Sequence, residues 1–257
     1  MIRAQMSLWT APDGWRHEGM EALWTLSTLR LRRLADAGHF NGLELVTDAE
    51  GEAWARGLGL PFTRITRALD ALPRAAGKIW SAGKLLAYSQ WTEPTVHIDG
   101  DVLLKRALPE WLVKAPFFFE RAEVGCPCRA GVPDADLLAW DMPADWRRGL
   151  EECHGLSYNF GIAGATAWRE FAGAATRCLD VVLANCGRRG HGGTASVFIE
   201  QWCMTRQLDP WRIATLLPAA PLSLYAARGD YRHLAGGLKI SPGWLRSVQH
   251  ALDREAD

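Results

Sequence analysis

The sequence predicts an α/β fold built on a doubly wound, mostly parallel sheet with helices on both faces. Two observations support it. Short apolar strands alternate with amphipathic helices through the first half of the chain, as in repeated βαβ units. The chain has 257 residues, of which 48% are hydrophobic and 23% charged, so it can bury an ordinary globular core. We therefore expect one Rossmann-type domain with a C-terminal elaboration.

The elements of the first half follow from the spacing of apolar residues. Gln5–Thr10 predicts a first strand that ends near the turn at Ala11–Gly14. Apolar residues at helical spacing predict a helix over Glu18–Ala37. The same alternation continues as strands at Gly42–Val46, Phe62–Ile65 and Pro94–Ile98 and helices at Glu52–Gly57 and Lys78–Gln90.

The second half has a looser pattern. We expect strands at Pro116–Glu120 and Leu156–Gly164, a helix at Phe171–Leu183, and loops at Val124–Pro133 and Cys186–Gly193. The glycine-rich second loop is interpreted as a surface loop, with a lid over the site as the alternative.

A last helix is expected over Pro242–Ala256, with Leu245, Val248 and Leu252 on one face. A single apolar stripe of this kind favours packing on the protein body over contact with a membrane that carries a lipid-linked acceptor.

Charge and cysteine usage exclude several classes of function. Lysine plus arginine equals aspartate plus glutamate at 29 each, which argues against nucleic-acid binding as the main activity. No apolar leader or membrane-spanning stretch is present, so we expect a cytoplasmic protein with reduced thiols. Cys126, Cys128 and Cys153-His154 offer an alternative zinc site, but only one residue separates the first pair, which is short for structural zinc.

The clearest chemical motif is His97-Ile-Asp99-Gly100-Asp101, where an apolar strand stops. Ligands of doubly wound sheets bind beyond the carboxyl ends of the strands. Two carboxylates at this spacing can converge on one cation once the chain turns, and Gly100 permits the turn. Hard divalent ions prefer such oxygen ligands.

A second motif lies near the C-terminus, in Tyr231-Arg-His233-Leu-Ala-Gly236-Gly-Leu-Lys239. It offers an imidazole ligand, a glycine that lets a phosphate approach the backbone, and a cation for leaving-group charge. One imidazole with two carboxylates modestly favours Mn²⁺ over Mg²⁺.

Together these motifs resemble the glycogenin and lipopolysaccharide galactosyltransferase family, which has the GT-A fold. Tyr158–Gly164 looks like the family's Phe-Asn-x-Gly-Val strand, Ile199–Gln201 like its acidic and amide segment beside the anomeric carbon, and Lys84 like its cation over the donor. The family usually has Tyr-x-Asp-x-Asp, and Pro-Trp commonly follows its lysine, where this chain has Ile240-Ser241. The chain looks like a divergent bacterial relative.

The resemblance implies a single GT-A-like domain over 1–257, with a nucleotide-binding half (1–107) and an acceptor-side half (108–257). It implies a metal-dependent glycosyltransferase that uses a nucleotide-sugar, chiefly a UDP-sugar, and Mn²⁺ or Mg²⁺. The metal ligands would be Asp99, Asp101 and His233, and the catalytic residues would be Glu200, Gln201 and Lys239. Donor-binding roles fall on Trp9, Thr10, Trp80, Lys84, Asp99, Gly100, Asp101, Asn159, Gly161, Gly236 and Lys239.

Several alternatives stay open. Retention is favoured, but an inverting enzyme would need a general base, for which Glu200 or Glu120 would serve. Trp9 could lie against the base or fill the core. The acceptor could be a saccharide, a lipid or a peptide. The main rival function is a non-catalytic nucleotide-sugar or carbohydrate-binding relative. A phosphatase or phosphotransferase is disfavoured, because its paired aspartates lie near the chain start and its motif does not fit Leu103.

Overall fold

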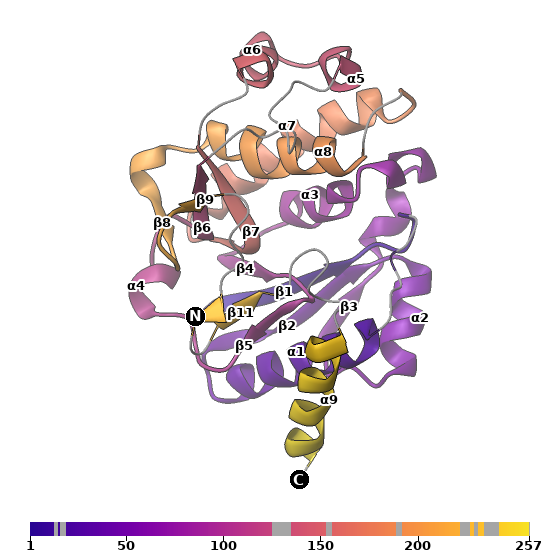
Figure 1. The fold of residues 1–257 in the computed structure, drawn as a ribbon, viewed down its shortest axis with the longest axis vertical. Helices are drawn as coiled ribbons and strands as arrows, with labels where there is room; N and C mark the ends of the chain where they lie inside the picture. The colour runs from indigo at the N-terminus through magenta and orange to yellow at the C-terminus, as the bar shows by residue number, and fades with distance from the viewer. Residues whose placement is uncertain are drawn as a thin grey trace.

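One mixed sheet runs through both halves of the chain (Figure 1). The computed structural model describes residues 1–12, 15, 19–124, 135–152, 156–188, 192–221, 227–228, 231–233 and 242–256. The strand order is β3-β2-β1-β4-β7-β6-β8, and β9 also pairs with β6. Its strands are β1 (Ile2–Leu8), β2 (Phe40–Thr47), β3 (Arg64–Thr66), β4 (Thr95–Ile98), β6 (Phe117–Val124), β7 (Leu156–Ala165), β8 (Ile213–Thr215) and β9 (Ala220–Pro221).

The sheet is mostly parallel. Strands β3, β2, β1 and β4 pair in parallel, as do β6 with β8 and β6 with β9. Strand β7 alone runs antiparallel to both of its neighbours, β4 and β6. The α/β class with a mostly parallel sheet is therefore confirmed.

A second, small sheet lies beside the carboxyl end of β4. It has the order β10-β11-β5, formed by β5 (Val102–Leu104), β10 (Ala227–Arg228) and β11 (Tyr231–His233), and both pairings are antiparallel. It joins the chain just after the Asp-x-Asp motif to a segment near the C-terminus.

Helices cover both faces of the main sheet (Figure 1). Helices α1 (Met20–Asp36) and α2 (Ala49–Gly57) pack with the face that carries Ala4, Met6 and Leu8. Helices α3 (Ser81–Ser89) and α7 (Trp168–Asn185) belong to the core on the other face. Strand β1 alternates accordingly, because successive side chains point to opposite faces.

The remaining elements are short, apart from the C-terminal helix α9 (Pro242–Ala256). The short α-helices are α4 (Glu110–Val113), α5 (Ala135–Leu138), α6 (Ala144–Glu152) and α8 (Gly192–Val197). The tighter 3₁₀ turns are η1 (Ala68–Ala71), η2 (Arg74–Lys78), η4 (Thr205–Gln207) and η5 (Pro210–Arg212). A π-helical turn, η3 (Phe198–Cys203), continues α8.

Most predicted elements appear with shifted ends. Strand β1 ends at Leu8, so Thr10 lies beyond the strand that was expected to contain it. Helix α3 begins only at Ser81, because the tighter turn η2 takes the chain up to Lys78. The helical stretch over 192–203 was not expected from the sequence. Residues 125–134 and 189–191 lie outside the described residues, and with them nearly all of the first predicted loop and the middle of the second, whose last two residues begin α8 instead.

The C-terminal helix was predicted with the bounds that the structure has, and it packs on the protein body. Val248 and Ala251 of α9 are buried in a small cluster with Leu23 and Leu26 of α1. Figure 1 shows α9 beside α1. Docking, the favoured expectation for this helix, is confirmed. None of the described helices combines the length and the apolar character that a membrane span requires.

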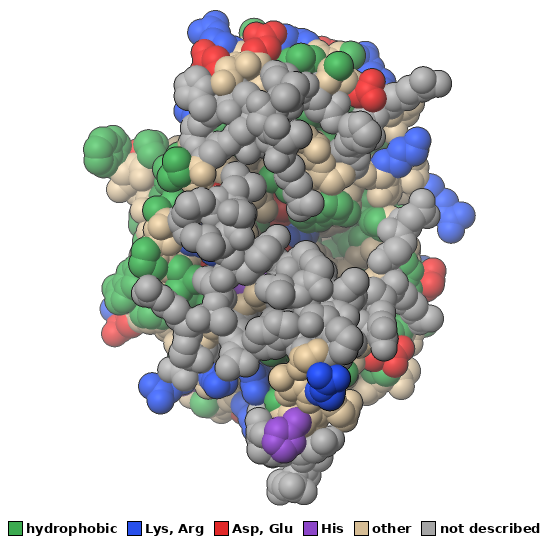
Figure 2. All heavy atoms as spheres, in the orientation of Figure 1, with side chains coloured by type: hydrophobic (Ala, Val, Ile, Leu, Met, Phe, Trp, Pro, Cys, Tyr) green, Lys and Arg blue, Asp and Glu red, His purple; other side chains and the backbone are tan. Residues whose placement is uncertain are grey.

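The far edge of the sheet exposes apolar side chains. Figure 2 shows hydrophobic side chains gathered on the side of the molecule that carries α4 and β8. Trp111 of α4 is 58% exposed and Trp211 of η5 is 94% exposed. Strand β8 is the last strand of the sheet order among the described residues, so this side is an edge of the sheet.

Candidate metal centre

The two aspartates follow directly from the end of β4. Val96 and Ile98 are fully buried and anchor the strand. The Asp99 backbone N–H donates to the Gly161 carbonyl (3.0 Å), and the Val102 N–H donates back to the Asp99 carbonyl (3.0 Å), which closes a tight turn. The turn brings both carboxylates to the carboxyl edge of the sheet, where ligands bind in such folds.

Gly100 is needed for space rather than for its backbone angles. Its φ lies outside the left-handed region that favours glycine. A Cβ at this position would come within 2.2 Å of the Trp24 ring. Glycine was expected here because it lets the backbone turn. The actual reason is that the ring of Trp24 occupies the space that a side chain at position 100 would need.

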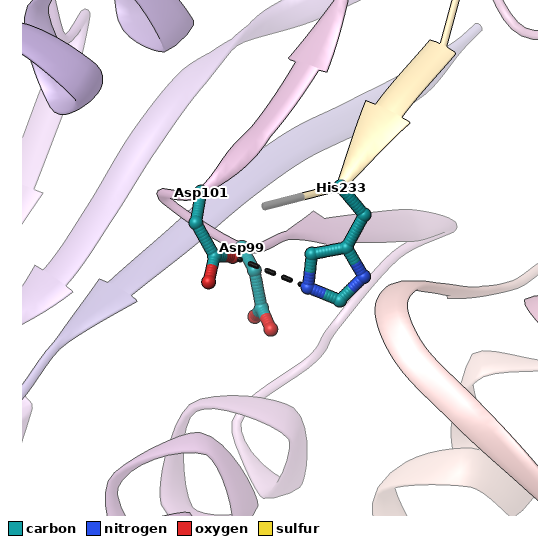
Figure 3. Close-up of side chains that lie close together, drawn as sticks. All are labelled: Asp99, Asp101 and His233. Carbon is teal, nitrogen blue, oxygen red and sulfur yellow. Dashed lines mark ion pairs between the residues drawn. The ribbon is translucent and has the colours of Figure 1, made fainter. Parts of the chain in front are cut away.

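His233 is delivered by the small sheet. In the antiparallel pairing of β5 with β11, His233 is the Cα partner of Val102, the residue after Asp101. Its Nε2 atom lies 3.4 Å from Oδ1 of Asp101 (Figure 3). One ligand atom from each of Asp99, Asp101 and His233 falls within 4.8 Å of the others. The three predicted ligands are brought together and could hold a metal ion.

Lys84 of α3 contacts the carboxylate of Asp99. Its Nζ atom lies 2.7 Å from both Oδ1 and Oδ2 of Asp99 and 3.3 Å from Oε1 of Glu200. Its ammonium also lies 5.3 Å from the ring centroid of Trp80. Burial alone would lower the pKa of Lys84, but the charges of Asp99 and Glu200 outweigh it and raise the pKa above its ordinary value. Lys84 is therefore a permanent cation here.

Glu200 lies in the π-helical turn η3 and is fully buried. Its Oε1 accepts a hydrogen bond from the Tyr88 hydroxyl (3.2 Å), while its Oε2 has no hydrogen-bond partner among the described residues. Burial raises the pKa of Glu200 to about 7, although the Lys84 ammonium acts in the opposite direction. Irregular π turns are frequent at functional sites.

A polar chain beneath the site was missed at the sequence level. Tyr88 also approaches Nδ1 of His97 (3.5 Å), and Nε2 of His97 lies 2.9 Å from the Ser7 hydroxyl. His97 Nδ1 is 3.5 Å from Asp99 Oδ1. Burial, and then the Lys84 charge, hold the pKa of His97 well below its usual range, so the imidazole is neutral. The spacing of His97 and Asp99 at i and i+2 was the available signal, since both side chains share a strand face.

Glu120 of β6 was expected only as a candidate general base of an inverting enzyme, and the structure places it against His233. It is fully buried, and its Oε2 lies 2.7 Å from Nδ1 of His233. Burial by itself would lower the pKa of His233, but the carboxylates of Asp101 and Glu120 raise it to about 10. No sequence signal links residues 113 positions apart.

The other predicted donor residues are spread around this centre. Thr10 donates to Asp48 through its N–H (3.0 Å) and its hydroxyl (2.7 Å), and Trp80 is 36% exposed. Trp9 is buried in the core against Gly83, where an added Cβ would lie 2.9 Å from Cβ of Trp9. This position agrees with the alternative in which Trp9 fills the core. A contact between Trp9 and a nucleotide base stays a prediction.

Asn159 of β7, another predicted donor-binding residue, makes its hydrogen bonds within the protein. Its amide donates to Glu123 (3.0 Å), and its oxygen accepts from the Gly161 N–H (2.9 Å). Gln201 is half-buried beside Glu200. The roles assigned to these residues stay predictions.

Some predicted residues lie outside the described part of the chain. These are Gly236, Lys239 and the four residues of the alternative zinc site, Cys126, Cys128, Cys153 and His154. The described cysteines, Cys178, Cys186 and Cys203, are free thiols.

Comparisons place the chain in a family without assigning a reaction. The model of a family of unknown function (DUF6734) matches residues 3–254, and the chain belongs to that family. No protein of curated function matches the sequence. Among solved structures, mouse xyloside xylosyltransferase 1 in its apo form is similar, with a TM-score of 0.42 and 12% identity over 83% of this chain and 84% of that one. The function must therefore be argued from the site.

Proposed function

We propose that this protein is a metal-dependent glycosyltransferase that moves a sugar from a uridine nucleotide-sugar to an acceptor, with retention at the anomeric carbon. One observation carries the proposal. Asp99, Asp101 and His233 converge within 4.8 Å at the carboxyl end of a central strand, with Lys84 and Glu200 beside them. Metal ligands, a fixed cation and a buried acid are the groups that transfer from a diphosphate leaving group requires.

The donor set suits a divalent ion. Two carboxylates and one imidazole are ligands for Mn²⁺ or Mg²⁺ rather than for a thiophilic metal. Asp99, Asp101 and His233 would hold the ion, which when bound supplies Lewis-acid charge to a diphosphate. The burial of His233 and the partial burial of both aspartates would keep that charge poorly screened by solvent.

The chain's own residues have distinct parts in this proposal. Lys84, a permanent cation, would bind donor phosphate oxygens and so weaken the bond between the anomeric carbon and the leaving diphosphate. Trp80, partly exposed next to Lys84, would cover an apolar face of the donor. The predicted Lys239 and Gly236 would contact the same diphosphate.

Glu200 and Gln201 would face the transferring sugar. Glu200 has a buried oxygen, Oε2, without a partner among the described residues, and a negative charge there would stabilise positive charge on the anomeric carbon. As the bond between the anomeric carbon and the diphosphate breaks, the acceptor oxygen would bond to that carbon and pass its proton to the departing phosphate. Because the phosphate that takes the proton leaves from the same face that the acceptor attacks, the anomeric configuration would be retained.

A non-catalytic nucleotide-sugar-binding relative is the second candidate. The observation that favours it is the contact of Lys84 with both oxygens of Asp99, because an ammonium can neutralise this carboxylate without a metal. Such a protein would bind a nucleotide at the same edge of the sheet and leave the donor intact.

A thermal-shift panel of nucleoside diphosphates, each with and without Mn²⁺, tests the proposal. Ligands that bind the folded state raise the melting temperature by mass action. We expect a shift with UDP that needs Mn²⁺ and disappears in Asp101→Ala. Release of UDP from a UDP-sugar then separates the enzyme from the binding relative, which releases none. Absence of any shift with every nucleotide and metal would reject both candidates.

A further inference from the structure

Glu120 is a buried carboxylate for which the proposed reaction has no use. Its side chain is fully buried on β6, and its Oε2 lies 2.7 Å from Nδ1 of His233. Its Oε1 has no partner of hydrogen-bond geometry within the described part of the chain, although Tyr231 is close enough that burial and then the Glu120 charge raise the pKa of its hydroxyl. A half-satisfied buried charge is costly to folding, so its presence at this place calls for a local explanation.

The neighbouring strand makes room for the contact between Glu120 and His233. A Cβ on Gly161 of β7 would lie 2.3 Å from Glu120 Oε2 and 2.7 Å from His233 Nδ1. The register between β6 and β7 also shifts between Phe119 and Arg121, on either side of Glu120. Such irregularities re-aim side chains and are common next to active sites. Local backbone structure and the missing side chain thus both favour the pair.

The contact between Glu120 and His233 determines which ring nitrogen of His233 is available to a metal ion. Nδ1 of His233 and Oε2 of Glu120 lie 2.7 Å apart, and a carboxylate oxygen accepts, so the Nδ1–H of His233 is the donor in this contact. The other ring nitrogen, Nε2, faces Oδ1 of Asp101 at 3.4 Å. A cation held by the aspartates would therefore meet the Nε2 lone pair of an imidazole whose orientation is already set.

We propose that Glu120 is a positioning residue that holds the ring of His233 with Nε2 turned toward the Asp99–Asp101 cation site. The inference rests on the metal site of the proposed function and goes beyond it in assigning Glu120. Glu120 then acts through His233 and not on the acceptor, in place of the general-base role that an inverting enzyme would have required.

Mn²⁺ titration followed by electron paramagnetic resonance of the free ion tests the effect on metal binding. Glu120→Gln keeps the shape of the side chain but removes its charge, and we expect Mn²⁺ affinity to fall about 10- to 100-fold. Glu123→Gln is the matched control, because it removes another buried carboxylate of β6, one that is held by Arg121 and Asn159 instead. We expect its Mn²⁺ affinity to stay within about twofold of wild type.

A second measurement tests the contact without metal. In protein labelled with ¹⁵N-histidine, the Nδ1–H of His233 should give a low-field proton resonance, assigned by its loss in His233→Asn. We expect the resonance to vanish in Glu120→Gln and to persist in Glu123→Gln. If Glu120→Gln does not fold, Glu120→Asp, which keeps the charge but shortens the side chain, is expected to show the same losses.

The outcomes separate the two proposals. If wild type binds Mn²⁺ and Glu120→Gln binds it equally well, the positioning role is overturned and the metal site stands. If neither wild type nor Asp101→Ala binds Mn²⁺, the metal site fails, and the positioning role fails with it. The inference is supported if Glu120→Gln loses both Mn²⁺ affinity and the low-field resonance while Glu123→Gln keeps both.

Discussion

Val102 and His233 are Cα partners in the antiparallel pairing of β5 with β11, and this pairing places the imidazole beside the carboxylate of Asp101. Two three-residue strands thus connect the Asp-x-Asp turn with a segment near the C-terminus. Short strands of this kind gain little stability by themselves. We therefore expect a ligand that binds between Asp101 and His233 to stabilise the pairing of β5 with β11.

Asp101→Asn should remove most of the Mn²⁺ affinity, because it replaces an anionic ligand with a neutral amide of the same shape. We expect a loss of at least about 100-fold, larger than for a residue that acts through a ligand. Isothermal titration calorimetry measures it. Asp145→Asn, on helix α6, is a suitable control and should bind Mn²⁺ as wild type does. Equal affinities for the two variants would remove Asp101 from the metal site.

Lys84→Gln should have opposite effects on metal and on nucleotide. The ammonium lies 2.7 Å from both oxygens of Asp99, so its removal frees this ligand, and Mn²⁺ affinity should rise several-fold. Affinity for UDP should fall, since the variant lacks a cation for the phosphates. The exposed Lys78 provides the control, Lys78→Gln. A fall in Mn²⁺ affinity in Lys84→Gln would contradict the competition between the two cations.

The same substitution should destabilise the metal-free protein, because Asp99 and Glu200 lose the cation between them. Breaking a buried ion pair costs roughly 3 to 5 kcal/mol, and the 14% exposure of the Lys84 side chain places the expected loss at the low end. Urea unfolding with and without Mn²⁺ measures the loss, and Mn²⁺ should restore part of it. Equal rescue of wild type and variant would argue against a cation site at Asp99.

Much of the fold could be predicted because the relevant signals are local. The α1 and α9 helices carry apolar residues at helical spacing, and β4 is an apolar strand that stops at Asp99. The paired aspartates and His233 could be predicted because carboxylates together with an imidazole are typical ligands of a divalent metal ion. Lys84 was named through the family resemblance, and the structure places it on Asp99.

The rest depends on contacts between distant parts of the chain. Tyr88 meets Glu200, and Glu120 meets His233, across more than a hundred residues in each case, and a single sequence carries no trace of such pairings. Strands β5 and β11 are too short to show a period of two. The reason for glycine at position 100 could not be foreseen, because it depends on the Trp24 ring.

Mn²⁺ affinity should rise with pH. In the metal-free protein the carboxylates of Asp101 and Glu120 raise the pKa of His233 to about 10 against the effect of burial, so the imidazole is protonated at neutral pH. A metal must displace that proton, and affinity should rise roughly tenfold per pH unit between about pH 6.5 and about pH 8.5. Calorimetry in buffers of different ionisation enthalpy counts the released proton. His233→Asn should bind more weakly and lose this pH dependence.

Glu200→Gln should separate catalysis from binding. Glu200 lies 3.3 Å from Lys84 but outside the group of metal ligands, so Mn²⁺ and UDP should still shift the melting temperature of the variant. Sugar transfer should fall about 100-fold or more, because the amide cannot offset positive charge at the anomeric carbon. Single-turnover kinetics with a UDP-sugar measure it. Undiminished transfer would move the sugar-facing role to another residue.

Gly161→Ala should damage the site through packing alone. The added Cβ would lie 2.3 Å from Glu120 Oε2 and 2.7 Å from two atoms of the His233 ring, so one of these buried side chains must move. Overpacking of this kind costs about 1 to 3 kcal/mol, and Mn²⁺ affinity should fall with it. Gly173→Ala on α7, where the nearest atom is 3.6 Å away at the end of Arg177, should be neutral or stabilising by up to about 1 kcal/mol. Chemical unfolding and Mn²⁺ titration of both variants decide the matter. A Gly161→Ala protein with unchanged stability and metal affinity would mean that Glu120 and His233 are not held together as the structure has them.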